Sequence, residues 1–216
     1  MIDIFCRGEV NSPLQFYSLE ARILMAKLLK DIQQVEVKSR SDLRKWLQDN
    51  HFQEKGVWLV TYKKISKYYL SYTDIVQECL CFGWIDSLPR KLDEIRTMLY
   101  ISPRKQGSNW SKVNKEYVAK LEQAKLLHPA GIEKIELAKQ DGSWSFLDDV
   151  EALIIPRDLQ LAFSGNQMAL ENWNAFPRSA KKGILEWIKN AKKTETRAKR
   201  IRDTVSKAKE NIRENY

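Results

Sequence analysis

The loop at residues 104–112, with the sequence RKQGSNWSK, combines side chains that can bind an anion. It places two cations and a glycine just before a predicted helix, where backbone N–H groups and the helix dipole favour negative charge. Trp110 can stack on a ring, and Asn109 or Ser111 can bond a phosphate or a carboxylate. The spacing is not that of a phosphate-binding Walker loop. The structural alternative is that Ser108 or Asn109 caps the helix while Trp110 packs on a sheet.

A second cluster of reactive side chains lies at residues 82–96, FGWIDSLPRKLDEIR. Asp86 can act as a general base there, with Arg90 holding an anionic substrate. The alternative is an Asp–Arg ion pair across a turn, with Trp84 buried. Neither Asp86 nor Asp93 has a histidine nearby in the sequence. The pattern therefore does not support a catalytic triad, and we assign no catalytic residue.

Together the two segments give one candidate ligand-binding surface. Its residues are Trp84, Asp86, Arg90, Arg104, Lys105, Ser108, Asn109, Trp110 and Asn114.

The cysteines do not suggest a metal site. Cys79 and Cys81 are too close together for a comfortable disulfide, and His51 and His128 form no local pair that could complete a tetrahedral site. We predict that both cysteines are small hydrophobic side chains on a helix, and we predict no metal and no cofactor.

The positive charge of the chain is local. Residues 178–209 hold twelve Lys and Arg against three acidic residues, which equals the net charge of +9 of the whole chain. This segment can contact nucleic acid or an anionic membrane surface, or it can be the solvated outside of a packed helix, opposite a stripe that includes Ala198, Ile201 and Val205. The candidate residues for anion contact are Lys189, Lys193, Arg197, Arg200 and Lys207.

Hydrophobic periodicity predicts an α+β fold that is mostly helical. Strands are expected at 33–37, 57–63 and 96–102, in a small antiparallel sheet. Helices are expected at 13–31, 129–140, 156–163, 166–173, 179–193 and 194–211. Three further helices are expected. One follows a capping box at 39–42, one is capped by Thr73, and one follows the loop at 104–109. The inner face of the last is predicted to carry Val113, Tyr117, Leu121 and Ala124. We predict an α+β domain at 1–150, with 1–32 as a helical extension, and a basic all-helical region at 151–216.

Neither a membrane-spanning run nor a secretory signal is evident in the sequence, and we therefore expect a cytoplasmic protein.

Several blocks resemble the bacterial YdeI/OmpD-associated family: GVWLVTYKK, YTDIVQECLCFGWIDS and SPRKQGSNWSKVNKE, then IPRDL and LEWIKNAKKTETRAKRI. The resemblance covers roughly residues 33–210. It implies a bacterial stress or defence protein, linked by the family's naming to bacteriocin and antimicrobial-peptide protection and to an outer-membrane porin. It implies no catalytic residue and no cofactor.

These observations favour a non-enzymatic cytoplasmic binding protein for an anionic ligand or a protein partner, acting in envelope stress or antimicrobial-peptide protection. Two alternatives stay open: a nucleic-acid-binding protein that uses the basic C-terminal helices, and a small-molecule enzyme that uses Asp86.

Overall fold

The structure is a computed structural model that describes residues 32–213 of the chain. The chain folds into two compact units. Among the described residues, the first unit holds 32–79 and 84–103, and the second holds 80–83 and 104–213. The predicted helix at 13–31 and the predicted extension at 1–32 fall almost entirely outside the described residues.

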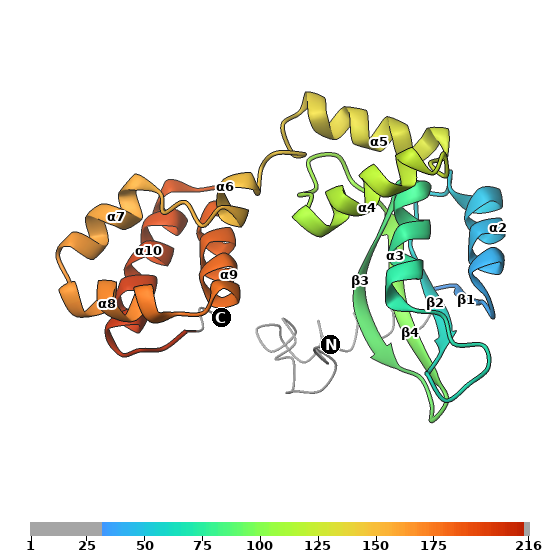
Figure 1. Ribbon diagram of the computed structural model, residues 1–216, viewed down its shortest axis with the longest axis horizontal. Helices are drawn as coiled ribbons and strands as arrows, with labels where there is room; N and C mark the ends of the chain where they lie inside the picture. Colours follow the sequence, from blue (N-terminus) through green and yellow to red (C-terminus); the bar gives the residue numbers. More distant parts are fainter. Residues whose placement is uncertain (1–31, 214–216) are drawn as a thin grey trace. The chain divides into compact units, whose positions relative to one another are not determined.

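The first unit is built on a four-stranded sheet with the order β1-β2-β4-β3 (Figure 1). The strands are β1 (Gln34–Glu36), β2 (Val57–Tyr62), β3 (Trp84–Lys91) and β4 (Arg96–Pro103). The predicted α+β class is confirmed. The sheet is mixed, because helix α2 (Arg40–Asn50) connects β1 to β2 as a crossover and leaves these two strands parallel, while the other pairs are antiparallel.

Helix α2 begins at the predicted capping box. The Ser39 hydroxyl accepts a hydrogen bond from the backbone N–H of Asp42 at 3.1 Å, and the Asp42 carboxylate accepts one from the N–H of Lys38 at 3.1 Å. Helix α3 (Tyr72–Cys81) begins earlier than predicted. Ser71, and not Thr73, caps it, because the Ser71 hydroxyl accepts from the N–H of Asp74 at 3.1 Å.

Cys79 and Cys81 are buried on α3, as predicted. The end of α3 makes a close contact within the second unit. The N–H of His128 donates to the Cys81 carbonyl at 3.0 Å, and Gly131 approaches so closely that a Cβ there would lie 2.2 Å from that oxygen. A glycine is therefore required at position 131.

The second unit is helical. Its elements are α4 (Lys112–Gln123), α5 (Pro129–Gln140), α6 (Asp148–Glu151), α7 (Arg157–Ser164), α8 (Gln167–Ala175), α9 (Arg178–Lys189) and α10 (Thr194–Lys209).

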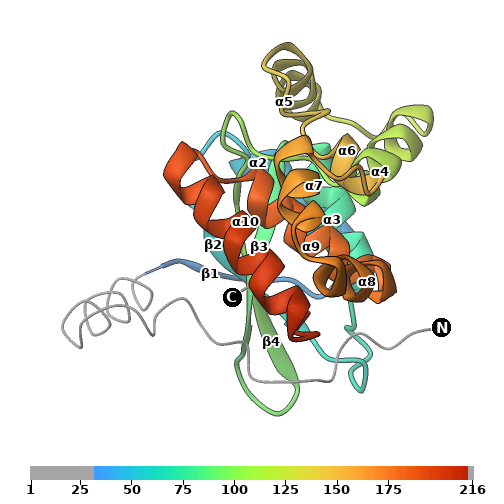
Figure 2. The same cartoon turned by 90° about the vertical axis from the view of Figure 1, so that its left-hand side faces the viewer.

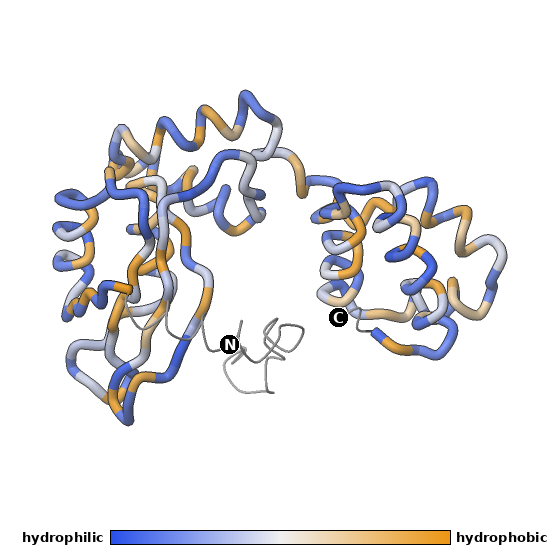
Figure 3. The backbone as a smooth tube through the Cα atoms, turned by 180° about the vertical axis from the view of Figure 1, so that it is seen from behind, coloured by the Kyte–Doolittle hydropathy of each residue, from blue (hydrophilic) through white to orange (hydrophobic). Residues whose placement is uncertain are grey.

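Helices α6–α10 surround one core that includes Leu159, Phe163, Trp173 and Ile188. Helix α10 packs against α7, α8 and α9 (Figure 2). Hydrophobic and hydrophilic positions alternate along these helices with the turn of the helix (Figure 3). The predicted helices of this region are confirmed to within a few residues.

Three details bear on the sequence predictions. Residues 84–91 form strand β3, where no strand was predicted. The buried side of α4 carries Val118 and Leu121, whereas Val113, predicted to face inward, is 51% exposed. In α10, Ile201 and Ala208 are buried as expected from the stripe.

Candidate functional site

The residues of the 104–112 loop converge on a stacked pair. Arg104 and Trp110 are both buried, and the guanidinium carbon of Arg104 lies 3.8 Å from the centroid of the Trp110 ring. Arg104 Nη1 also donates to the carbonyl of Asn109 at 3.0 Å. Its backbone N–H donates to the Gly83 carbonyl at 2.9 Å, which anchors the start of the loop. The loop therefore presents a buried cation in a fixed orientation.

A pocket of about 250 Å³, part of it open to solvent, lies beside this pair. One wall is the loop, and the other is the last turns of α5 with the residues that follow it. The lining residues are Arg104, Lys105, Gln106, Gly107, Ser108, Trp110, Lys134, Leu137, Ala138, Asp141 and Ser143.

Trp110 lines this pocket, and its buried indole N–H is an unpaired donor. The Trp110 side chain is 1% exposed, and among the described residues its Nε1 has no hydrogen-bond partner. A buried donor without an acceptor costs about 1–3 kcal/mol, and native proteins rarely keep one without a reason. Trp84 shows the contrast, since it is also fully buried but its Nε1 donates to the His51 carbonyl at 3.2 Å.

The charges around the pocket are mostly positive. Arg104, Lys105 and Lys134 line it, against the one carboxylate of Asp141. The Asp141 carboxylate already accepts hydrogen bonds from the backbone N–H of Gly107 at 3.2 Å and of Ser143 at 2.9 Å. The pocket is therefore suited to a small ligand with acceptor oxygens and negative charge.

The remaining loop residues have mainly structural contacts. The Ser108 hydroxyl donates to the Lys105 carbonyl at 2.5 Å, and the Asn109 amide donates to the Asn190 side chain at 3.0 Å. The cap of α4 is Ser111, whose hydroxyl accepts from the backbone N–H of Asn114 at 3.2 Å. The pocket thus lies beside the loop, and neither Ser111 nor Asn114 lines it.

The other three predicted ligand residues lie on β3 in the first unit and do not line this pocket. Trp84 packs edge-on against Trp46, with ring centroids 5.6 Å apart. The Asp86 carboxylate accepts a hydrogen bond from the hydroxyl of Tyr72 at 2.6 Å. The guanidinium of exposed Arg90 lies 5.3 Å from the ring centroid of Trp58.

Several of the predicted basic residues are engaged within the helical bundle. Lys189 pairs with Asp149 at 2.5 Å, and Arg197 makes two bonds to Asp158, at 2.6 and 3.0 Å. These bonds from Arg197 lower the pKa of Asp158.

Arg200 donates to the Trp187 carbonyl and lies over the Trp187 ring at 4.9 Å. Lys193 is exposed, and Lys207, in the last turn of α10, is half-buried. Lys189, Arg197 and Arg200 of this segment therefore make contacts within the helical bundle.

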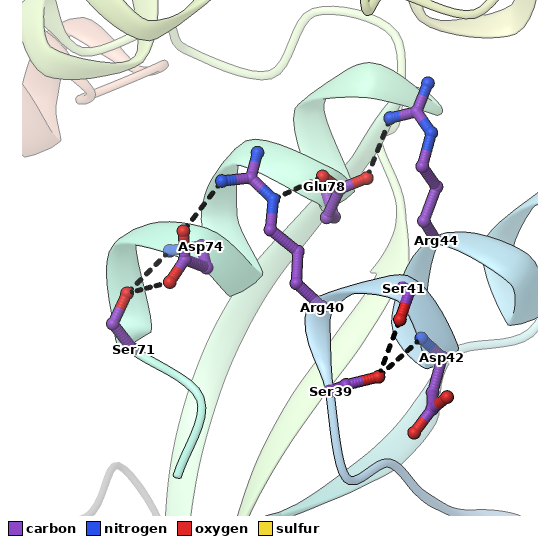
Figure 4. Close-up of polar contacts among 8 residues, drawn as sticks. All are labelled: Ser39, Arg40, Ser41, Asp42, Arg44, Ser71, Asp74 and Glu78. Atoms are coloured by element: carbon purple, nitrogen blue, oxygen red, sulfur yellow. Dashed lines mark hydrogen bonds and ion pairs between the residues drawn. The ribbon is translucent and has the colours of Figure 1, made fainter. Parts of the chain in front are cut away.

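The first unit contains an ionic cluster that sequence reasoning missed (Figure 4). Glu78 of α3 is 2% exposed, and its two oxygens accept from Arg40 Nε at 2.7 Å and Arg44 Nη1 at 2.9 Å. Arg40 also bonds Asp74 at 2.7 Å. Because both arginine partners of Glu78 come from α2, the cluster holds α2 against α3. The signal was present in the sequence as two i, i+4 pairs, one of arginines and one of carboxylates, each on one face of its helix.

Lys134, Asp141 and Ser143 were also missed, because they belong to a helix and turn that lie far along the chain from the loop.

Within residues 32–213, no group of acidic, histidine or cysteine side chains is arranged to hold a metal ion. None of the helices in that range is long and apolar enough to span a membrane.

Two family models match different parts of the chain. Residues 35–134 match a domain of unknown function (DUF8412), and residues 152–211 match the family described as bacteriocin-protection, YdeI or OmpD-associated. No curated protein and no solved structure matches the chain significantly. The family match is therefore narrower than the resemblance over 33–210 and falls on helices α7–α10. Residues 152–211 of the chain are thus similar to the YdeI/OmpD-associated family.

Proposed function

We propose that this protein binds a small anionic ligand, or the anionic group of a larger one, in the pocket beside Arg104 and Trp110. The observation that carries the proposal is the buried indole N–H of Trp110, which has no acceptor among the described residues. A ligand oxygen would supply one. The guanidinium of Arg104, stacked on the same ring, would hold negative charge next to it.

The ligand class follows from the balance of groups at the pocket. Three cations face one carboxylate, and that carboxylate is occupied by two backbone N–H groups. A phosphate or carboxylate group meets these requirements, whereas a cationic ligand would leave the indole N–H unpaired.

The proposal extends to the role of the protein. We propose a non-enzymatic binding protein of the cytoplasm that acts in envelope stress or in protection against bacteriocins or antimicrobial peptides. The description of the family matched at residues 152–211 supports the proposed role in protection against bacteriocins. Cell fractionation tests the location.

Isothermal titration calorimetry of the full chain with inorganic phosphate, acetate and glucose tests the binding proposal. We expect saturable binding of at least one anion and none of glucose. Trp110→Phe, which keeps an aromatic ring under Arg104 but removes the N–H, should weaken anion binding at least fivefold. Trp187→Phe removes a tryptophan from the helical bundle and should leave binding unchanged. Equal binding by both variants would reject the pocket as the site.

Nucleic-acid binding remains the second candidate, supported by cations that project from the bundle. Lys192, Lys193, Lys199 and Arg202 are exposed, and no ion pair to them occurs between residues 32 and 213. If this surface binds nucleic acid, affinity should fall steeply as salt rises, and Lys193→Gln with Lys199→Gln should reduce that slope. Binding that is insensitive to both changes would exclude this candidate.

A further inference from the structure

A second hollow lies between helices α4 and α5. Figure 1 shows these helices joined by a short connection, which turns the chain back on itself. The hollow is a groove of about 390 Å³, much of it open to solvent, whose walls are one face of each helix. It shares no lining residue with the pocket at Arg104.

The floor and one end of the groove are apolar. Val118 of α4 and Ile135 of α5 are buried beneath it, and Leu127 and Ile132 form the end near the connection between the helices. Ile132 is 46% exposed although it lies on the face that lines the groove. An exposed isoleucine on the wall of a hollow leaves apolar surface in contact with water, which a ligand could cover.

The opposite end of the groove is lined by two lysines, the carboxylate of Glu136 and the ring of Trp144. Lys115 of α4 and Lys139 of α5 approach the ring of Trp144, with their ammonium nitrogens 5.9 and 5.8 Å from its centroid. Their carboxylate partners are Asp148 for Lys115 and Glu136 for Lys139, and both of these carboxylates are more than half exposed. Each can turn toward water when another anion takes its place.

The ends are separated along the helices. Lys115 and Glu122 differ by two turns on α4, a rise of roughly 10 Å. A ligand that fits this arrangement has a negative group at the Lys115 and Lys139 end and an apolar body that reaches toward Ile132. Glu122, at the apolar end, would repel a second negative group.

We propose that the groove between α4 and α5 binds an amphipathic monoanion, such as a medium-chain alkyl carboxylate, with its carboxylate at Lys115 and Lys139. The charge pattern and the exposed apolar wall give this polarity to the site. The proposal does not depend on anion binding at Arg104. Trp144 does lie next to Trp110, with ring centroids 5.0 Å apart, and mutants are needed to separate the two sites.

The test is calorimetric titration of the full chain with octanoate, 1-octanol and octylamine. We expect octanoate to bind most tightly and octylamine least. Ile132→Glu, which places a negative charge on the apolar wall, should weaken octanoate at least tenfold. Val113→Glu makes a similar change at an apolar residue of α4 that is 51% exposed and does not line the groove, and it should change binding less than twofold.

Lys139→Gln should weaken octanoate several-fold and leave 1-octanol unchanged. The proposal is overturned if octylamine binds as tightly as octanoate, or if Ile132→Glu binds octanoate like the unmodified protein. Trp110→Phe should leave octanoate binding in place, so that a failure at one site is distinguished from a failure at the other.

Discussion

The guanidinium of Arg104 lies 3.8 Å from the ring centroid of Trp110, and both side chains are buried. A buried cation normally requires an anion or a full set of acceptors. The indole face meets part of this need, and the Asn109 carbonyl meets another part. The arrangement holds positive charge next to a buried donor that has no acceptor among residues 32–213.

Arg104→Lys should destabilise the protein by about 1–2 kcal/mol, because lysine keeps the charge but loses the planar stacking and the fixed hydrogen bond to Asn109. Urea unfolding measures the change. Lys105→Gln alters a neighbouring exposed cation and should stay within about 0.5 kcal/mol. Equal effects of the two changes would mean that the stacked pair does not stabilise the fold.

Glu78→Gln should destabilise the first unit by about 3 kcal/mol, because it leaves Arg40 and Arg44 without the carboxylate that neutralises them. Glu94→Gln is the matched control. Its side chain is 87% exposed, its partner is Lys91, and its loss should cost less than about 0.5 kcal/mol. Chemical unfolding of both variants compares them, and a mild effect at Glu78 would show that the cluster is not needed to hold α2 on α3.

The pair of Asp158 and Arg197 should make stability depend on acid. The pKa of Asp158 is lowered in the folded protein by the bonds from Arg197. Its contribution is therefore present in full above the unfolded-state pKa of about 4, and it is lost as the pH falls through the lower folded-state value. Asp158→Asn should lower the melting temperature at pH 7, and the difference should shrink toward pH 3. A difference that stayed constant with pH would contradict this assignment.

Gly131→Ala should destabilise the protein by about 2–3 kcal/mol, because the new Cβ would lie 2.2 Å from the backbone oxygen of Cys81. Gly183, also within a helix, has nothing within 4 Å of the corresponding position. Gly183→Ala should therefore raise stability by about 0.5–1 kcal/mol through helix propensity. Thermal melts of the two variants should move in opposite directions, and a Gly131→Ala variant that melts no lower than the unmodified protein would argue against the close approach of Gly131 to the Cys81 carbonyl.

Local signals in the sequence were enough to place most elements. Examples are the β-branched and aromatic run at 57–62, the capping box at 39–42 and the apolar stripe of α10. Each of these patterns can be recognised from residues that are close together in the sequence. Strand β3 was missed because its partner is needed to recognise it. Its side chains from Ser87 to Lys91 are exposed, it contains Pro89, and its pairing with β4 shifts between Asp86 and Pro89.

The candidate site was predicted only in part, because some of its residues come from a distant part of the chain. The loop at 104–110 attracted attention through its own residue types, but Lys134 and Asp141 meet it only through the packing of α5. Sequence reasoning also grouped Asp86 and Arg90 with the loop, and the contacts of both residues lie within the first unit, at Tyr72 and Trp58. The unpaired donor at Trp110 could not be foreseen, because pairing of an indole depends on its three-dimensional surroundings.

The indole N–H of Trp110 gives the most direct test. A ¹H–¹⁵N correlation spectrum of the protein should show seven tryptophan indole signals, and the one lost in Trp110→Phe belongs to Trp110. During titration with phosphate or acetate, we predict that this signal moves downfield and saturates, while the signal of Trp84, whose N–H already has an acceptor, stays in place. A Trp110 signal that does not move at saturating anion, or that moves no more than the signal of Trp84, would contradict anion binding at this pocket.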